Sequence, residues 1–330
     1  MIHKPSYAPV LMAAGLMCTL WGAVTTWAIS GVGLIVVAIA SVRWIRDAGQ
    51  QPQASTAPQE EPAARVTVKP ETSDILNVRM TSPWLHRFAI LVAVCAFALV
   101  LSGALVTSND PQPAAFLQRM HLIAGLSVGI LAASLGMWLR GPGWILLASV
   151  VLDSMLGGRS PAIGALHAFV AQLFFAGTVS IALITSRGWI DASDQVPDSA
   201  RFSLRTLSLV ALPLLILQVA LGAAYRHKAM GIMPHIIGAL VVTLALLLLA
   251  VLVTNQYPEH RALRPAAKLL IGITFTQVML GMGAFITRLM MAEGTLPVVI
   301  ISVAHVATGS LTLACTVVLT LLIRRYLTAV

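Results

Sequence analysis

Apolar residues recur along the chain in runs of roughly 20 residues, each bounded by charged, proline or glycine residues. A helix of this length spans the hydrocarbon core of a bilayer, whereas a membrane β-barrel would show shorter segments of alternating polarity. The pattern therefore predicts an all-α polytopic membrane protein of ten helices, of which the fifth is the shortest. We expect these helices at 8–28, 31–46, 84–107, 118–139, 144–158, 162–186, 203–224, 234–254, 266–287 and 296–323.

A polar segment divides this series of helices. Residues 47–83 are rich in proline, glutamine and glutamate and show no periodicity, which is typical of a disordered linker. A two-helix membrane hairpin, residues 1–46, is predicted before the linker, and an eight-helix domain, residues 84–330, is predicted after it. No cleavage site follows the first apolar run, so we expect the hairpin to remain attached.

The composition supports the membrane class. Of the 330 residues, 58% are apolar and 10% are charged, whereas a soluble domain is usually about 25% charged. The net charge of +9 is spread over the ends of the apolar runs and forms no compact basic face, so nucleic acid is not an expected partner. The three cysteines fall inside apolar runs, where they cannot form a disulfide between loops.

The distribution of basic residues predicts the orientation in the membrane. One set of alternate loops and ends carries most of them: Arg43, Arg46, Arg65, Lys69, Arg79, Arg87, Arg140, Arg187, Arg201, Arg205, Arg261, Arg264, Lys268, Arg324 and Arg325. The other set carries only Arg119, Arg159, Arg226, Lys228 and Arg288. Because basic loops stay in the cytoplasm, we expect an integral inner-membrane protein with both termini on the cytoplasmic side.

An internal repeat is visible in the predicted eight-helix domain. Four segments end in glycine near the outer end of an outward-going helix: Leu99–Gly103, Asp153–Gly157, Gln218–Gly222 and Gln277–Gly281. A histidine opens, or lies within, the helix that follows each segment, and these residues are His121, His167, His235 and His305. The repeat predicts two pseudo-symmetric four-helix halves with two histidines each.

These four histidines are the candidate metal ligands. Neutral imidazole is a common axial ligand of heme iron, and two facing helices with one histidine each can hold a porphyrin between them. Within the halves we expect His121 to pair with His167 and His235 with His305. The alternative for any single membrane histidine is a hydrogen bond between packed helices.

Other polar residues near the predicted outer surface are further candidates. Arg226 and Lys228, which flank His227, have the charge to bind heme propionates, although contact with lipid headgroups explains them equally well. Asp153 is a carboxylate within a short apolar helix and needs a partner or a proton there. It is a candidate for catalysis, for proton conduction or for a hydrogen bond at the position equivalent to Gln218 and Gln277, and we favour the hydrogen bond.

A combination of motifs resembles a known family. The strongest is Gln218-Val-Ala-Leu-Gly-Ala-Ala-Tyr-Arg-His227 followed by His235, and the others are Leu101-Ser-Gly-Ala-Leu-Val-Thr107, Gln277-Val-Met-Leu-Gly281 before His305, and His167 after Gly157-Gly158. Together they are similar to the heme A synthase family of cytochrome oxidase assembly, over about residues 84–325. The resemblance implies eight helices in two pseudo-symmetric halves, one holding heme b and the other receiving heme O.

The resemblance also implies a reaction and roles for residues. The family oxidises the C8 methyl group of heme O to a formyl group, which gives heme A. By this resemblance His235 and His305 hold heme b, and His121 and His167 lie at the substrate heme. The expected partners are heme, heme O synthase and cytochrome c oxidase. An electron-donor protein is also expected, because the chain has no flavin- or nucleotide-binding motif.

The sequence departs from the family at two points. Gln118 stands where the family usually has a glutamate three residues before the first histidine, and the chain lacks the cysteine pair that many members carry in an outer loop. An amide cannot exchange a proton as a carboxylate does, so Gln118 favours an alternative function, that of a non-catalytic heme-binding assembly factor. The N-terminal hairpin lies outside the resemblance and faintly resembles small segments of heme–copper oxidase subunits, which suggests a module that docks onto an oxidase.

Overall fold

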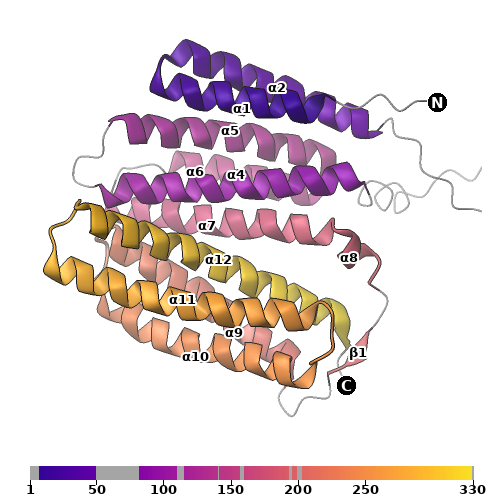
Figure 1. Ribbon diagram of the computed structural model, residues 1–330, viewed down its shortest axis with the longest axis vertical. Coiled ribbons are helices and arrows are strands. Elements are labelled where there is room, and N and C mark those ends of the chain that lie inside the picture. The colour runs from indigo at the N-terminus through magenta and orange to yellow at the C-terminus, as the bar shows by residue number, and fades with distance from the viewer. Residues whose placement is uncertain are drawn as a thin grey trace, which may run out of the picture.

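The computed structural model describes residues 7–49, 82–109, 115–139, 141–156, 160–192, 195–198 and 203–328. Its long helices run side by side along one common direction (Figure 1). They are α1 (Ala8–Val24), α2 (Trp27–Gly49), α4 (Pro83–Ser108), α5 (Ala115–Leu139), α6 (Gly141–Met155), α7 (Pro161–Ile184), α9 (Leu204–Arg226), α10 (Met233–Gln256), α11 (Leu263–Met290) and α12 (Leu296–Tyr326). A short helix, α8 (Arg187–Ile190), and two paired strands, β1 (Val196–Pro197) and β2 (Leu327–Thr328), complete the described elements.

The predicted fold class is confirmed. Each of the ten predicted helices has a counterpart in the structure, and eight of the described helices are long and apolar enough to cross a membrane. The other two, α1 and α6, contain 17 and 15 residues, fewer than the roughly 20 that a full span needs. The predicted disordered linker falls mainly on residues 50–81, which lie outside the described residues.

One predicted boundary is wrong. We expected the turn between the first two helices at residues 29–30, but α1 ends at Val24 and α2 begins at Trp27. Ser30 lies inside α2, where its hydroxyl donates to the carbonyl of Thr19, 3.0 Å away. A small polar residue at this position allows close packing of the two helices. The same residue type is also typical of turns, which explains why the turn was predicted there.

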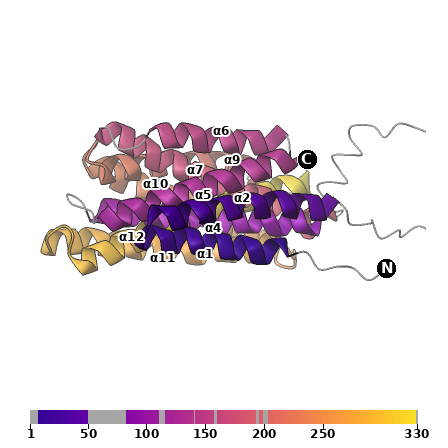
Figure 2. The same cartoon turned by 90° about the horizontal axis from the view of Figure 1, so that it is seen from above.

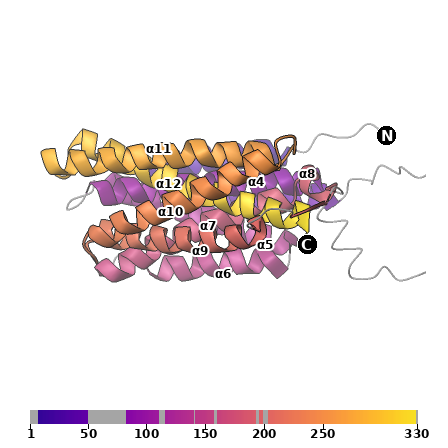
Figure 3. The same cartoon turned by 90° about the horizontal axis from the view of Figure 1, so that it is seen from below.

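The body consists of two four-helix rings with the same connectivity. In the first half α4, α5, α6 and α7 pack in a ring in chain order, and in the second half α9, α10, α11 and α12 do the same. The halves meet where α12 packs on α4 and α7, and where α7 packs on α9. In each ring the second and fourth helices, α5 with α7 and α10 with α12, therefore lie diagonally opposite and enclose the centre. Figure 2 and Figure 3 show the common direction of these helices from two opposite sides.

The N-terminal hairpin packs against the first half. Helices α1 and α2 both contact α5, and α2 also contacts α4. Trp44 of α2 is buried between aromatic rings of α4, with ring centres 6.0 Å from Trp84 and 5.4 Å from Phe88. Edge-to-face pairs at these distances are favourable, so the hairpin shares the apolar core of the first half.

The two ends of the bundle differ in what they carry. Helices α5, α7, α10 and α12 all begin at the end of the bundle opposite the labelled N- and C-termini (Figure 1). At the other end, β1 pairs with β2, and Asp198 accepts hydrogen bonds from the Ser203 hydroxyl and the Arg205 amide. These contacts fix the loop before α9 to the end of α12.

Candidate functional site

The four candidate histidines come together as two pairs inside the two rings. His121 lies on α5 and His167 on α7, while His235 lies on α10 and His305 on α12. Each histidine lies within about the first three turns of its helix, and these helices all begin at the same end of the bundle. Because the paired helices are diagonal in their rings, each pair lies at the centre of its half.

The two pairs have nearly the same geometry. The ring centres of His121 and His167 are 6.0 Å apart with an angle of 90° between the planes. The ring centres of His235 and His305 are 6.2 Å apart with an angle of 88°. The repeat detected in the sequence therefore corresponds to a repeated side-chain arrangement, with the pairing expected from the order of the helices.

The repeated glycines make room for the imidazoles. A Cβ atom on Gly103, Gly222 or Gly281 would lie 3.0, 2.8 or 3.1 Å from the Cε1 atom of His121, His235 or His305, respectively. These distances are shorter than ordinary van der Waals contact, so any larger residue would displace the ring. The glycines are thus required by packing against histidine, in addition to any role in contact between helices.

In the first half, the Nδ1 atoms of both histidines face hydrogen-bond acceptors. The Ser102 hydroxyl donates to the carbonyl of Leu99 at 2.7 Å, which leaves its oxygen to accept from His121 Nδ1 at 2.9 Å. The His167 Nδ1 atom lies 3.0 Å from the carbonyl oxygen of Asp153. A ring whose Nδ1–H is donated in this way keeps the lone pair of Nε2 for a metal ion.

Asp153 makes a second contact with the same ring. Its Oδ1 atom lies 3.0 Å from His167 Nδ1, and both side chains are largely buried, with exposed fractions of 13% and 27%. Asp153 occupies the first position of its repeat, as Gln218 and Gln277 do in theirs. The side-chain contact is a close approach of two ionisable groups, since Asp153 Oδ1 has no hydrogen-bond partner among the described residues, and the hydrogen bond to His167 comes from the Asp153 backbone carbonyl.

In the second half, glutamine amides contact the histidines, one at Nδ1 and the other at Nε2. Gln218 Nε2 lies 3.0 Å from His235 Nδ1 and donates to the His235 carbonyl at 2.8 Å, while Gln277 Nε2 lies 3.4 Å from His305 Nε2. Three buried polar atoms around this pair have no hydrogen-bond partner among the described residues: Gln218 Oε1, Gln277 Oε1 and His305 Nδ1. Such a cluster of unpaired atoms marks a place that needs a polar ligand or water.

Basic residues lie beside the second pair. Arg226, at the end of α9, donates to the carbonyl of Ala104 and to the hydroxyl of Ser108, both on α4 and both at 2.6 Å. Arg288, on α11, lies with its guanidinium carbon 5.8 Å from the centre of the Tyr225 ring. Lys228, the other candidate for heme propionates, pairs with Glu293 at 3.5 Å on the surface.

Two of these residues were missed in the sequence. Ser102 was noted only as part of the glycine-ended repeat, and Arg288 was assigned only to the charge distribution. In the sequence Arg288 is 62 positions from Arg226 and 17 from His305, and no motif connects them. Gln118, at the position of the family glutamate, lies exposed on the first turn of α5 and has no hydrogen bond among those of the described residues.

The donor set fits heme better than a metal ion held by protein ligands alone. A metal–imidazole bond is about 2 Å long and a ring nitrogen lies about 1 Å from its ring centre, so two imidazoles on opposite sides of one ion have centres about 6 Å apart. Both observed pairs match this separation. The described part of the chain contains no group of three or more His, Cys, Asp or Glu side chains able to hold a metal ion, whereas heme needs only two axial ligands.

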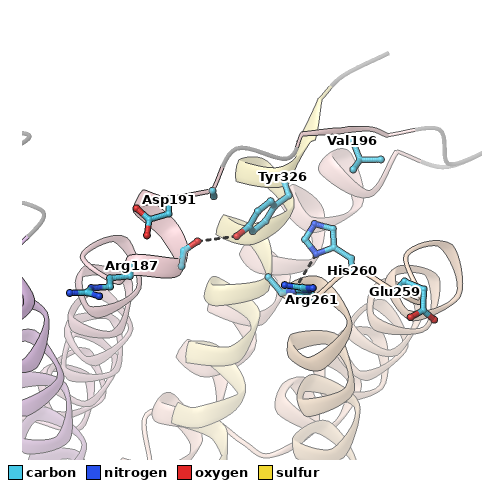
Figure 4. Close-up of a pocket in the computed structure, with 10 residues that line it drawn as sticks. Arg187, Asp191, Val196, Glu259, His260, Arg261 and Tyr326 are labelled. Carbon is cyan, nitrogen blue, oxygen red and sulfur yellow. Dashed lines mark hydrogen bonds between the residues drawn. The ribbon is translucent and has the colours of Figure 1, made fainter. Parts of the chain in front are cut away.

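A separate pocket lies at the opposite end of the bundle. It has a volume of about 470 Å³ and is lined by Arg187, Asp191, Glu259, His260, Tyr326 and neighbouring residues of α8 and of the α10–α11 loop (Figure 4). Tyr326 donates to the carbonyl of Gly188 at 3.0 Å, and His260 accepts from the amides of Ala262 and Leu263 at the start of α11. These contacts join α12 to α8 and satisfy backbone amides at the start of α11.

Comparison with known proteins does not identify a family for this chain. No family model, no curated protein and no solved structure matches it. The functional argument therefore depends on the geometry of the two histidine pairs and on the motifs in the sequence.

Proposed function

We propose that this protein is a heme-binding membrane oxidoreductase of the heme A synthase type, which oxidises the C8 methyl group of heme O to a formyl group for cytochrome oxidase biogenesis. The observation that carries the proposal is the repeated histidine pair, one in each ring, with ring centres 6.0 and 6.2 Å apart. Two imidazoles with ring centres at this separation have the spacing needed to ligate one iron ion from both sides.

The second half is assigned to the resident cofactor, heme b, by resemblance to the family. His235 and His305 would be its axial ligands. Gln218 would position the His235 ring once its amide oxygen turned toward Nδ1–H, and Gln277, which lies 3.4 Å from His305 Nε2, would give up that contact to the iron. The unpaired buried atoms of both glutamines support a polar group bound nearby. When bound, this heme would transfer electrons between the substrate and a partner protein.

The first half is assigned to the substrate, heme O. His121 and His167 would hold its iron, with Ser102 and Asp153 fixing the tautomer and direction of the two rings. Asp153 also places a carboxylate in contact with this pair, at His167. It would accept protons released at the substrate more readily than Gln118, whose amide has no acidic proton.

Conversion of a methyl group into a formyl group removes four electrons and adds one oxygen atom, which water or dioxygen would supply. The sequence contains no nucleotide or flavin motif, so the electrons require a redox partner. We propose an electron-transfer protein for this role, with heme O synthase and cytochrome c oxidase as the suppliers and users of the pigment. The charge distribution further supports an inner-membrane location with both termini in the cytoplasm, so that the histidine pairs lie in the outer half of the membrane.

A second function is favoured by one specific residue. Gln118 replaces the glutamate of the family and lies exposed without a described partner. The same two heme sites would then serve a non-catalytic assembly factor that carries heme to the oxidase. Both functions require heme at the histidine pairs, and they differ in the pigment that accumulates.

Pigment analysis separates the two functions. The protein is purified from cells that make heme O and have no other heme A synthase, and its hemes are extracted and separated by chromatography. Heme A, or its hydroxylated precursor, is expected if the protein is the enzyme. Heme B alone, lost in the His235→Ala and His305→Ala variants, would indicate the assembly factor. Absence of any heme would contradict both functions.

A further inference from the structure

Two arginines meet beside the second histidine pair, at the boundary between the halves. Arg226 ends α9 and Arg288 lies in the last turn of α11, with its guanidinium carbon 5.8 Å from the ring centre of Tyr225, the residue next to Arg226. Ser302, which faces Arg288 Nη2 at 3.4 Å, is one helical turn before His305 on α12. The two charges therefore lie at the depth of the histidine pair.

Neither arginine has an acidic partner in the part of the chain that the structure describes. Arg226 donates to a carbonyl and a hydroxyl, and Arg288 contacts a hydroxyl and the face of the Tyr225 ring. By contrast, the exposed Lys228 already pairs with Glu293. Two cations close together in a partly buried place repel each other, and this repulsion is costly unless an anion lies between them.

The arrangement of the two groups suits a carboxylate. A guanidinium presents several N–H donors in a planar fork that matches the two oxygens of a carboxylate. The neutral contacts of Arg226 hold its fork in place and leave its charge uncompensated. Among the described residues Arg288 makes one weak hydrogen bond, so within that part of the chain most of its donors remain available.

We propose that Arg226 and Arg288 form one carboxylate-binding site, which takes the propionate groups of the porphyrin held between His235 and His305. The proposal rests on the proposed heme binding and replaces Lys228 with Arg288 as the partner of Arg226. Because Arg226 also donates to Ala104 on α4, next to the Gly103 that faces His121, a ligand here joins the second half to the first. A lipid phosphate is the other oxyanion of suitable chemistry in a membrane.

The test compares two porphyrins that differ only in their carboxylates. The full-length protein, freed of pigment, is titrated in detergent with heme B and with heme B dimethyl ester, and binding is followed by absorbance. Each charge-assisted hydrogen bond contributes about 1.5–3 kcal/mol, so we expect heme B to bind at least about tenfold more tightly than the ester. In Arg288→Gln, and separately in Arg226→Gln, this preference should fall by about tenfold or more.

Control variants make the result specific. Arg119→Gln removes an exposed arginine on the same side of the molecule and should keep the full preference for heme B. Lys228→Gln should lower the preference by less than Arg288→Gln does. Arg288→Gln tests the site even if Arg226→Gln disturbs the contact between the halves, because Arg288 makes no described hydrogen bond to the first half.

The outcomes distinguish this proposal from the proposed function. Equal affinity for heme B and its ester in the unmodified protein, with both still requiring His235, would overturn the carboxylate site and leave heme binding intact. An anionic lipid that copurifies with the unmodified protein, is lost in both arginine variants and leaves the preference between porphyrins unchanged would assign the site to lipid phosphate. Failure of both porphyrins to bind would contradict heme binding itself.

Discussion

At the residue scale, the histidine sites depend on small neighbours as much as on the imidazoles. Three of the four rings lie against a glycine with no room for a Cβ atom, and three have an Nδ1 contact with a serine, a carbonyl or an amide. Such neighbours fix ring direction, and their loss typically lowers metal affinity about 10- to 100-fold. Substitutions next to the histidines should therefore affect pigment more than stability.

The glycine contact is tested by Gly222→Ala. The added Cβ atom would lie 2.8 Å from His235 Cε1, so the ring must move, and we expect the variant to lose most of the heme bound in the second half. Gly272→Ala on α11 is the matched control, because a Cβ atom there meets nothing within 4 Å. Heme content per protein, measured by pyridine hemochrome, should fall only in Gly222→Ala. Equal heme content in the two variants would show that the glycine contact does not matter.

The serine contact is tested by Ser102→Ala. This change removes the acceptor that holds His121 Nδ1 at 2.9 Å, and we expect affinity for heme in the first half to fall about tenfold. The control is Ser154→Ala on α6, whose hydroxyl bonds only to the nearby carbonyl of Val151. Titration with heme measures the affinity of both variants. Unchanged affinity in Ser102→Ala would mean that other contacts orient His121.

At the element scale, the structure is two equivalent rings of helices with a hairpin packed on one of them. The diagonal helices carry the histidines, and the remaining two helices of each ring bring in the residues that support them. The short α6 illustrates this arrangement, since it supplies Asp153 to His167 despite being too short to match the long spans. The hairpin adds a layer of aromatic packing to the first ring only.

The packing of the hairpin is tested by Trp44→Ala. Trp44 is 7% exposed and touches Trp84 and Phe88, and removal of a buried aromatic side chain costs about 3–5 kcal/mol in soluble cores. We expect a clear drop in the thermal unfolding temperature in detergent. Trp27→Ala is the control, because Trp27 is 53% exposed. Equal unfolding temperatures would mean that the hairpin is only loosely attached.

At the scale of the whole molecule, the sequence predicted the helices and the histidine pairs better than it predicted their surroundings. The apolar runs are long, so their places along the chain predict the helices. The glycine–histidine repeat then predicts which histidines pair, because it assigns two of them to each four-helix half. The meeting of Arg226 with Arg288 could not be predicted, because it joins separate helices without a shared motif. Ser102 lay within the repeat before His121, but the repeat was defined by its glycine and did not single out the hydroxyl as the partner of the ring. The turn at residues 25–26 was missed because Ser30 and Gly31 have the composition of a turn yet lie in a helix.

The two rings of helices differ in the polar residues around their histidines. The histidine pairs are alike in spacing and angle, but a carboxylate supports the first and amides support the second. The uncompensated arginines lie beside the second pair. The proposed function, with one resident heme and one exchanging heme, requires such a difference between two otherwise equivalent sites.

The central claim, that each histidine pair binds one heme through both imidazoles, is tested most directly by electron paramagnetic resonance of the oxidised, purified protein. Imidazole planes near 90° leave two iron d orbitals close in energy, so the account predicts strongly anisotropic low-spin signals. His121→Ala or His167→Ala should remove the signal of the first site, and His235→Ala or His305→Ala that of the second. High-spin iron alone, or low-spin signals that persist in all four variants, would contradict the account.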